Sequence, residues 1–380
     1  MKEQAKLHFA NLDILRFTAA FYVLAAHIFD YTTEVYKLPS WLFKNNEIVY
    51  PENLNTLGSF VNMFFKNGSF GVDMFFLISG FLITSLLLRE KSKNSTIDIK
   101  SFYVRRILRI WPLYYFIVFF AFGFAKFYTH EEMHLRDLIP HLFFVGNFSM
   151  IHALSWCSGK LFILWSICIE EHFYLIIPIL LFLVPIKRLP WLVVALILVS
   201  IVTRIVLFKM YPYPWFPIYL HTFSRFDVLA IGCFLGWLNF NQFKFQLPIA
   251  LRWLLLVGLF IFMGVFSVRF YDTFFYAVFF KYFYIIPSAI LFYDLVINVF
   301  PTFSGMFNSF FNRLGKYSYG IYMYHPFAII FCNNLANQYF NQSKIAFALL
   351  SILCTVSVAF FSYEVFEKHF LKLKSRFEKI

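Results

Sequence analysis

The sequence has few charged residues, few cysteines and none of the alternating pattern of a β-sheet protein. Only 14% of its 380 residues are charged, whereas 61% are hydrophobic. The five cysteines are an odd number without metal-ligand spacing, so we expect neither a disulfide framework nor a metal site. The apolar runs are near twenty residues long, whereas the strands of a membrane barrel alternate over about ten. This pattern excludes a barrel and predicts an integral membrane protein made of helices.

Acidic residues are also scarce, with 20 Asp and Glu against 33 Lys and Arg, which gives a net charge of +13. Such a balance could indicate a nucleic-acid partner. The basic residues, however, lie mainly in short segments between apolar runs, where membrane topology explains them. We therefore expect no nucleic acid among the partners. The chain shows no internal repeat, and we interpret residues 1–380 as a single membrane domain without a fused soluble domain.

About ten apolar stretches are long enough to span a membrane. Loops that face the cytoplasm collect Lys and Arg, and such residues are frequent in segment 89–109 and after residue 367. We therefore place these segments, and both termini, in the cytoplasm. The fold predicted is an all-α, polytopic bundle of about ten transmembrane helices. The spans are roughly 12–30, 69–88, 110–128, 161–184, 190–208, 225–240, 252–268, 274–298, 318–336 and 345–366.

The first span carries ionisable side chains although it is apolar enough to lie in the membrane. Asp13, Arg16 and His27 all fall within it. Such groups at bilayer depth are costly and indicate a functional site. Arg16 and His27 are separated by three helical turns, so they project from nearly the same face, ~16 Å apart along the axis. The predicted topology places Arg16 toward the cytoplasm and His27 toward the outside.

The second span brings Asp73 to a depth similar to that of His27. One interpretation is a carboxylate that orients the imidazole, and the other is an interfacial Asp that caps the helix start. Ser79 and Gly80 follow in the same span, and for both we favour a role in close helix packing.

Three arginines lie at the cytoplasmic start of the third span. Arg105, Arg106 and Arg109 are three and four residues apart, so a helix would group their guanidinium groups. Such a group suits phosphates, although from composition alone the positive-inside rule and anionic lipids are the better explanation. We assign Arg16 and Tyr114 to the same predicted cofactor-binding set.

Two adjacent carboxylates interrupt the fourth span. Glu170 and Glu171 point about 100° apart, and Ser166 shares a face with Glu170. We expect at least one Glu to face a polar cavity as an acid, a base or the partner of a cation such as Arg16. A structural ion pair between helices is the alternative for either residue.

We assign Arg225 and His325, together with Ser166, to substrate binding. Arg225 opens the sixth span on the outer side, where it binds an anionic or sugar substrate or reaches back to water. His325 lies inside the ninth span, and a hydrogen bond between helices is its default role. Arg204 and Lys281 also lie within spans, and the sequence assigns them no role.

Six motifs follow one another along the chain. They are Arg-x10-His, Gly-Val-Asp-x-Phe-Phe-x-Ile-Ser-Gly-Phe, Arg-Arg-x-x-Arg-Ile-x-Pro-x-Tyr-Tyr, Trp-Ser-x-x-x-Glu-Glu-x-Phe-Tyr, Ser-Arg-Phe-Asp and Ser-Tyr-x-Ile-Tyr-x-x-His-Pro. Together they resemble the membrane-bound acyltransferase family 3, which includes bacterial O-antigen and exopolysaccharide O-acetyltransferases. The resemblance runs from about residue 8 to 366.

The resemblance implies an enzyme of the bacterial cytoplasmic membrane. It would pass an acyl group, usually acetyl, from acyl-coenzyme A to a hydroxyl of a cell-surface carbohydrate or lipid-linked glycan. Acyl-coenzyme A would be a co-substrate rather than a permanently bound cofactor, and a homo-oligomer is compatible with the sequence. Carried over by position, His27 is the catalytic His, Arg16 its paired cation, Arg105, Arg106 and Arg109 the basic motif, and Glu170 and Glu171 the carboxylate motif.

The mechanism expected is proton removal from the acceptor hydroxyl by His27, with Asp73 or a Glu of the fourth span fixing the imidazole. A variant acylates His27 first, and the sequence leaves both open. The alternative function is a membrane transporter of an acyl group or glycan component, whose buried charges would form a pathway. The absence of an internal repeat argues against it.

Overall fold

The computed structural model describes residues 9, 11–32, 56–157, 160–266, 273–298 and 305–377, which form helices joined by short connections. No strand occurs among these residues. The first half of the chain forms α1 (Leu12–Thr32), α2 (Thr56–Lys66), α3 (Ser69–Asn94), α4 (Ile99–Phe124), α5 (Leu135–Leu142), α6 (Gly146–Ala153) and α7 (Trp165–Leu183). The second half forms α8 (Leu189–Met210), α9 (Trp215–Leu220), α10 (Thr222–Phe240), α11 (Ile249–Val265), α12 (Tyr282–Ile297), α13 (Gly305–Lys316), α14 (Ser318–Tyr339), α15 (Lys344–Ser362) and α16 (Lys368–Lys374).

Each predicted span coincides with a helix, and the prediction of a polytopic helical bundle is confirmed. Eight helical segments in the described part of the chain are long and apolar enough to cross a membrane. The other two predicted spans are α11, with 17 residues, and α14, with 22. Tyrosines and amides lower the hydropathy of α14, which explains why it is long enough but not among the eight.

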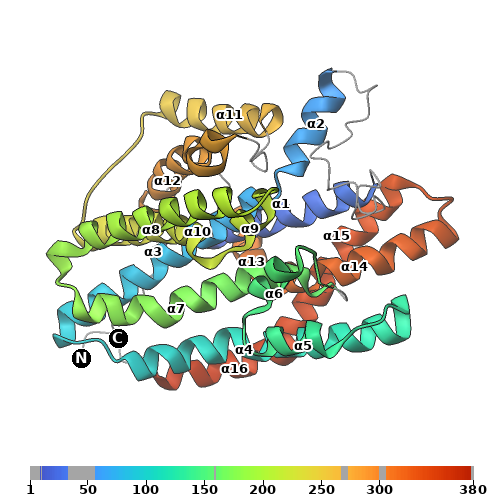
Figure 1. Cartoon of the computed structure of the whole chain (residues 1–380), viewed down its shortest axis with the longest axis horizontal. Helices are drawn as coiled ribbons and strands as arrows, with labels where there is room; N and C mark the ends of the chain where they lie inside the picture. Colours follow the sequence, from blue (N-terminus) through green and yellow to red (C-terminus); the bar gives the residue numbers. More distant parts are fainter. Residues whose placement is uncertain are drawn as a thin grey trace.

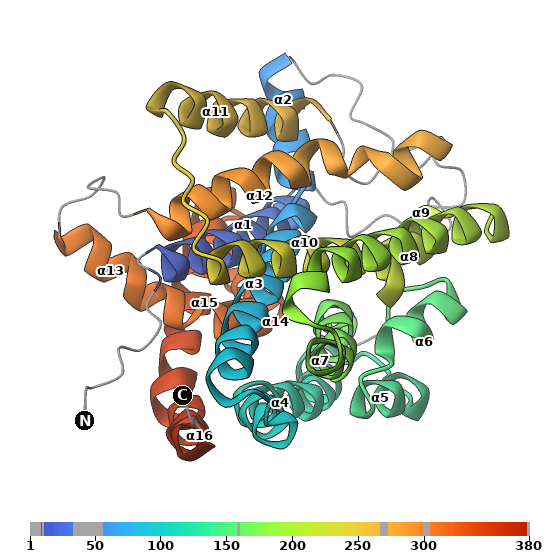
Figure 2. The same ribbon diagram turned by 90° about the vertical axis from the view of Figure 1, so that its left-hand side faces the viewer.

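The basic connections gather at one end of the bundle. The connections α3–α4, α7–α8 and α10–α11 lie at the left of Figure 1, and the α14–α15 turn lies at the right. This arrangement is the one that the charge pattern predicts, so we take the left end as the cytoplasmic end. Figure 2 looks onto it and shows α1, α3 and α14 in the middle of the bundle, with α11 and α16 at its edges.

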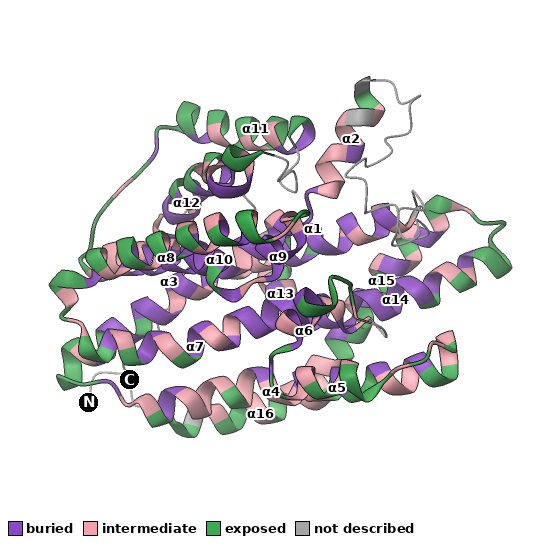
Figure 3. Ribbon diagram, in the orientation of Figure 1, coloured by how far each residue is buried: buried purple, intermediate pink, exposed green. Residues whose placement is uncertain are grey.

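Burial follows this arrangement. The apolar window of α3 is 72% buried, whereas that of α8 is 28% buried. Figure 3 shows the same contrast, with exposed residues concentrated along the peripheral helices. The exposed side chains of α8 include Val194, Leu198 and Val202, which suit contact with lipid. The central helices α3 and α14 therefore offer positions at which polar side chains are shielded from the bilayer.

Small residues let α3 and α10 approach closely. A Cβ added to Gly80 would collide with the carbonyl oxygen of Leu229, and one added to Gly232 would collide with that of Leu77. Membrane helices associate through such close packing because lipid gives no hydrophobic drive for it. The packing role expected for Gly80 is confirmed.

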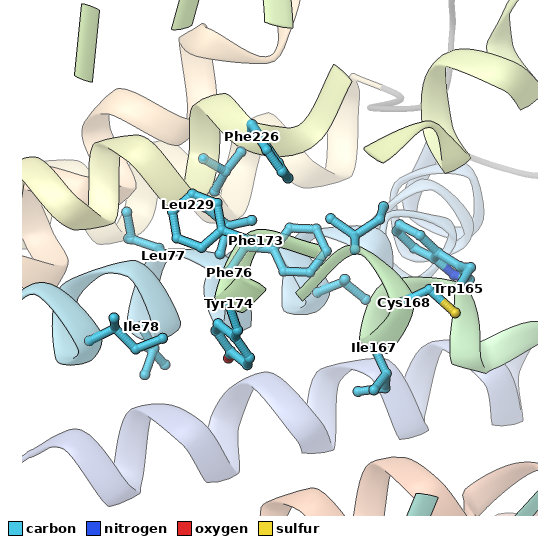
Figure 4. Packing of buried hydrophobic residues seen from close by; sticks show 14 of the residues in the cluster. Phe76, Leu77, Ile78, Trp165, Ile167, Cys168, Phe173, Tyr174, Phe226 and Leu229 are labelled. Carbon is cyan, nitrogen blue, oxygen red and sulfur yellow. The ribbon is translucent and has the colours of Figure 1, made fainter. Parts of the chain in front are cut away.

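Apolar side chains fill the space between α3, α7 and α10. Phe76 and Leu77 of α3 are fully buried, as is Phe173 of α7 at 1% exposure. The rings of Phe173 and Phe226 meet edge to face at 5.2 Å. Figure 4 shows these residues together with Leu229 of α10. This cluster gives α3 and α7 a rigid backing for the polar side chains on their other faces.

The glycine contact generates a stability prediction. We expect Gly80→Ala to lower the midpoint of thermal unfolding in detergent by several degrees, because overpacking a close contact costs about 1–3 kcal/mol. Gly258→Ala is the matched control, since a Cβ there meets nothing within 4 Å. The control should leave the midpoint unchanged or raise it, because Ala favours helix. Equal midpoints for the two variants would contradict the packing role.

Candidate active site

His27 of α1 and His325 of α14 form a pair. The Nδ1 atom of His27 lies 3.0 Å from Nε2 of His325, and the rings stack with centroids 4.8 Å apart. His325 is 1% exposed, whereas His27 is half-buried. The expected interhelical hydrogen bond of His325 is confirmed, and its partner is the histidine that the sequence nominates as catalytic.

A backbone carbonyl determines which nitrogens of this pair carry protons. Nδ1 of His325 lies 2.6 Å from the carbonyl oxygen of Tyr322, which only accepts, so Nδ1 carries the hydrogen. In the neutral ring Nε2 is then an acceptor, and Nδ1 of His27 must donate to it. The lone pair of neutral His27 is therefore on Nε2. This tautomer follows from the hydrogen-bond pattern and is the one that a general base needs.

His27 borders a cavity of about 460 Å³ at the non-cytoplasmic end, which we name the outer cavity. The ends of α1 and α14 and the start of α15 form most of its wall. Its lining combines apolar side chains with two lysines and three amides. These residues are His27, Tyr31, Lys160, Phe162, Pro326, Ile329, Ile330, Asn333, Ala336, Asn337, Gln342, Lys344 and Phe347.

A second pocket of about 90 Å³ lies toward the cytoplasmic end, and we name it the inner pocket. It collects cations from two helices and a carboxylate from a third. The residues are Arg16, Val72, Phe75, Phe76, Ile78, Ser79, Leu82, Arg106, Arg109, Ile110, Ser166, Ile167, Glu170, Tyr174, Ser318, Tyr319 and Tyr322. The expected proximity of Arg16 to the arginine motif is thus seen for Arg106 and Arg109.

Arg105 departs from the expected grouping of three guanidinium groups. Its Nη2 contacts Glu90 Oε2 at 3.3 Å, and its Nη1 donates to the carbonyl oxygen of Phe377 at 2.8 Å. Arg105 and Arg106 are about 100° apart around the helix, with Arg109 between them, so the pocket takes Arg106 and Arg109 while Arg105 lies at the far edge of this arc. Arg105 therefore ties α4 to α3 and to the C-terminal segment.

Tyr322 lies between the inner pocket and the histidine pair. Its side chain lines the inner pocket, and its carbonyl accepts from His325. Its hydroxyl donates to the carbonyl of Ile163 at 2.8 Å and lies 2.7 Å from Ser166 Oγ. Ser166, predicted to bind substrate, thus lines the inner pocket and helps to hold the residue that separates it from His27.

The two glutamates point in different directions, as their spacing predicts. Glu170 lines the inner pocket and accepts hydrogen bonds from Ser79 and Tyr174, both at 3.0 Å. Glu171 accepts from Trp111 Nε1 at 3.0 Å and is buried. The expectation that one Glu faces a polar cavity holds for Glu170. Ser79, expected to serve packing, is instead one of its hydrogen-bond donors.

Asp73 and Arg225 pair with each other, a contact that the sequence does not predict. Arg225 Nη2 lies 2.5 Å from Asp73 Oδ1, and Tyr284 donates to Asp73 Oδ2 at 2.9 Å. Both carboxylate oxygens are thus engaged away from His27. Gly71 faces α1, because a Cβ there would lie 2.6 Å from the carbonyl of Ala19. Two further residues turn the helix by ~200°, which directs Asp73 toward α10 and α12.

The environment of Arg225 is closed. Its guanidinium lies over the rings of Phe76, Trp165 and Tyr219 at 5.9, 5.8 and 5.3 Å. The residue is 2% exposed. Arg225 is therefore part of the interhelical packing and lines neither pocket. Its predicted substrate-binding role stays a prediction.

Tyr114 is also in the core rather than in a pocket. Its hydroxyl donates to the carbonyl of His141 at 2.8 Å, and its ring stacks on Phe144 at 4.2 Å. Tyr114 lines neither pocket, and its predicted cofactor-binding role stays a prediction.

Arg204 and Lys281 share one carboxylate. Each lies 2.6 Å from Asp227, and Tyr282 donates to the same group at 2.8 Å. Two cations around one buried carboxylate with these hydrogen bonds form a structural network. This pairing explains why intramembrane charges to which the sequence assigns no role are tolerated.

Sequence reasoning assigned Ser79 to packing and overlooked four other polar side chains of the inner pocket. They are Tyr174, Ser318, Tyr319 and Tyr322. Tyr174 lies four residues after Glu170 and Tyr322 three residues before His325, so helical spacing was a usable signal for both. The bond between Ser79 and Glu170 joins residues 91 apart, which no local pattern predicts.

The comparisons with known proteins agree with this arrangement. A family model described as an acyltransferase domain matches residues 9–364. O-acetyltransferase OatA of Staphylococcus aureus is 30% identical over 323 residues, which are 80% of this chain and 52% of the relative. Peptidoglycan O-acetyltransferase OatA of Listeria monocytogenes is 36% identical over 198 residues, 48% of this chain and 32% of the relative. The putative peptidoglycan O-acetyltransferase YrhL of Bacillus subtilis is 34% identical over 197 residues, 48% of this chain and 31% of the relative.

No solved structure matches the chain significantly. The chain spans about half the length, or less, of the curated relatives it matches. Because the family model covers nearly all of it, the chain belongs to this acyltransferase family. The prediction of the family is confirmed.

The Asp73–Arg225 pair generates a prediction about thermal stability, which tests whether the two residues act as a structural pair. We expect Asp73→Asn and Arg225→Gln each to lower thermal stability strongly, because removing one partner of a buried pair costs about 3–5 kcal/mol. The double variant should lose much less than the sum of the two, since neither charge is then left unpaired. Circular dichroism of detergent-solubilised protein measures the midpoints.

The matched control is Glu364→Gln, which removes one partner of the exposed Glu364–Lys368 pair. We expect little change there, because surface ion pairs contribute little. Additive losses from the two single variants would show that Asp73 and Arg225 do not act as a pair.

Proposed function

We propose that this chain is a membrane O-acetyltransferase that carries an acetyl group from cytoplasmic acyl-coenzyme A to a hydroxyl of a cell-wall glycan. The relatives named as peptidoglycan O-acetyltransferases support the acetyl group and the class of acceptor. The observation that carries the proposal is the way in which the two pockets approach each other at the histidine pair. An arginine-lined pocket toward the cytoplasmic end meets, at Tyr322, a histidine pair that opens into the outer cavity.

The donor is assigned to the inner pocket on its chemistry. Arg16, Arg106 and Arg109 approach it from α1 and α4. Guanidinium groups bind phosphate oxygens with paired hydrogen bonds, so they suit the phosphates of coenzyme A. Glu170 lines the same pocket and partly balances this charge, and Asp13 accepts a hydrogen bond from Arg16 at 3.2 Å.

The inner pocket is narrow in this structure. Its volume of about 90 Å³ is below the roughly 300–1,000 Å³ typical of ligand pockets. Binding the pantetheine arm therefore requires side chains around Tyr322 and Ser166 to move apart. Such movement would bring the thioester from the arginines toward His27, a distance of ~16 Å along α1.

The chemical step uses the lone pair on Nε2 of His27. The acceptor hydroxyl gives its proton to His27 as its oxygen attacks the thioester carbonyl. A carbon–oxygen bond forms, the carbon–sulfur bond breaks, and the thiolate of coenzyme A takes the proton from His27. The atoms and charges of this step balance without a further reactant.

His325 acts on this step as a positioning residue. By accepting from Nδ1 of His27, it keeps the ring in the tautomer that has its lone pair on Nε2. When His27 becomes charged, the same contact shares the proton across two imidazoles. A variant in which His27 is acylated first uses the same atoms, and a covalent adduct on His27 would distinguish it.

The first functional prediction concerns His27 itself. We expect His27→Ala to abolish acetylation of surface glycans while the protein is still made, because no other group replaces the base. Mass spectrometry of glycans from cells with wild-type or variant gene measures the loss of one acetyl mass. His152→Ala, an exposed histidine on α6, is the control and should behave as wild type. Unchanged acetylation in His27→Ala would reject the proposal.

The second functional prediction compares Arg109, which lines the inner pocket, with Arg105, which does not. Arg109→Gln should raise the KM for acetyl-coenzyme A about tenfold or more, since one charge-assisted hydrogen bond is lost. Arg105→Gln should leave this KM near that of wild type, because Arg105 contacts Glu90 instead of the pocket. Initial rates of purified protein in nanodiscs measure both. A larger effect for Arg105 than for Arg109 would place the donor elsewhere.

A further inference from the structure

The outer cavity is positively charged around His27. Lys160 and Lys344 line it, and no Asp or Glu occurs among its described lining residues. Asn333 and Asn337, four residues apart on α14, add amide donors and acceptors on one face. Tyr31 and Phe162 contribute aromatic surface. Such a lining suits a polar ring that bears a negative charge.

The two lysines differ in their partners. Lys160 lies 3.0 Å from Glu131 Oε1, and both side chains are about one-third exposed. Lys344 is exposed, and no described residue forms an ion pair with it. Lys344 therefore brings uncompensated charge to the cavity, while Glu131 fixes the position of Lys160.

The backbone adds to the charge at Lys344. α15 begins at this residue, and Ser343 accepts from the backbone nitrogen of Ala346 at 3.3 Å. The first turn of α15 contains no acidic residue, and Phe347 of that turn also lines the cavity. A helix start favours negative charge, so a lysine there makes the local potential more positive.

Membrane topology does not account for these lysines. The positive-inside rule explains basic residues at the cytoplasmic end, whereas Lys160 and Lys344 line the outer cavity. Lys344 opens α15, at the α14–α15 turn on the opposite side of Figure 1 from the basic connections. A cavity of about 460 Å³ is large enough for a sugar ring with a substituent. We therefore look for the reason for the positive lining in the charge of the ligand that the cavity binds.

We infer that the acceptor presented to His27 is an anionic glycan, whose carboxylate or phosphate binds Lys344 and Lys160 while a neighbouring hydroxyl reaches the imidazole. This inference rests on the proposed function and adds to it the charge of the acceptor. The amides of Asn333 and Asn337 bind the hydroxyl or amide groups of the same ring. The lysines act on acceptor selection and take no part in the bond changes.

The experiment measures protection of His27 from carbethoxylation by diethyl pyrocarbonate. The full chain is held in phosphatidylcholine nanodiscs, and modification of the His27 peptide is followed by mass spectrometry. The probes are N-acetylglucosamine, which is neutral, N-acetylmuramic acid, which has a carboxylate, and N-acetylglucosamine 6-phosphate. We expect at least one anionic sugar to protect at a concentration about tenfold lower than the neutral sugar.

The variants test the source of this preference. Lys344→Gln and Lys160→Gln should each reduce the anionic advantage, and Lys344→Arg should retain it. Lys187→Gln, an exposed lysine in the α7–α8 connection at the other end, is the matched control and should match wild type. Protection by N-acetylmuramic acid alone identifies a carboxylate, and protection by the phosphorylated sugar alone identifies a phosphate.

Two results would overturn the inference. One is equal protection by neutral and anionic sugars in the wild type, or a preference that both Lys→Gln variants leave unchanged. The other is protection by phosphatidylglycerol in the nanodisc that equals protection by the sugars, which would assign the lysines to a lipid headgroup. Because protection involves no acetyl transfer, it is read independently of the His27→Ala glycan assay, which tests the proposed function.

Discussion

The hydrogen bond between His27 and His325 is the contact on which the proposed site depends. It joins α1 to α14, residues 298 positions apart, and it gives His27 a defined tautomer. The backbone carbonyl of Tyr322 determines this tautomer. A carbonyl oxygen only accepts, so Nδ1 of His325 carries the hydrogen and its Nε2 accepts from His27. A carboxylate in the same place would hold the ring as well, but it would add a charge at bilayer depth. A second neutral imidazole orients His27 without that cost.

Two groups of buried charges in the described bundle differ in their surroundings. Asp73 and Asp227 are enclosed with cations and tyrosine hydroxyls, which satisfies each carboxylate within the helix packing. Arg106, Arg109 and Glu170 instead border a pocket. A membrane protein tolerates the first group because every charge has a partner, whereas the second group lines a space in which we propose that the donor binds. Location beside a pocket, rather than mere presence in a span, is therefore the basis on which we assign function.

Much of the fold could be predicted because hydropathy and loop charge act locally along the chain. The spans and the division of basic loops follow from them, as does the shared face of Arg16 and His27. The partners of Asp73 and Arg105 could not be predicted. Arg225 is 152 residues from Asp73, and the choice of partner depends on which helices become neighbours. Arg105 and Arg106 differ by one residue, so a small rotation of α4 decides which of them faces the pocket. Periodicity gives relative directions around a helix, but it does not say which direction is inward.

Two chambers at opposite ends of one bundle impose a requirement on the boundary between them. In the proposed mechanism, donor and acceptor meet at His27, yet an open passage would let small solutes cross the membrane. Tyr322 meets this requirement, since its hydroxyl closes against Ile163 and Ser166 while its carbonyl holds the histidine pair. Moving its side chain to admit the thioester leaves the carbonyl bond to His325 in place, because a side-chain rotation does not displace the backbone. In the proposed mechanism, the Tyr322 side chain can therefore move to admit the donor while the hydrogen bonds that orient His27 stay in place.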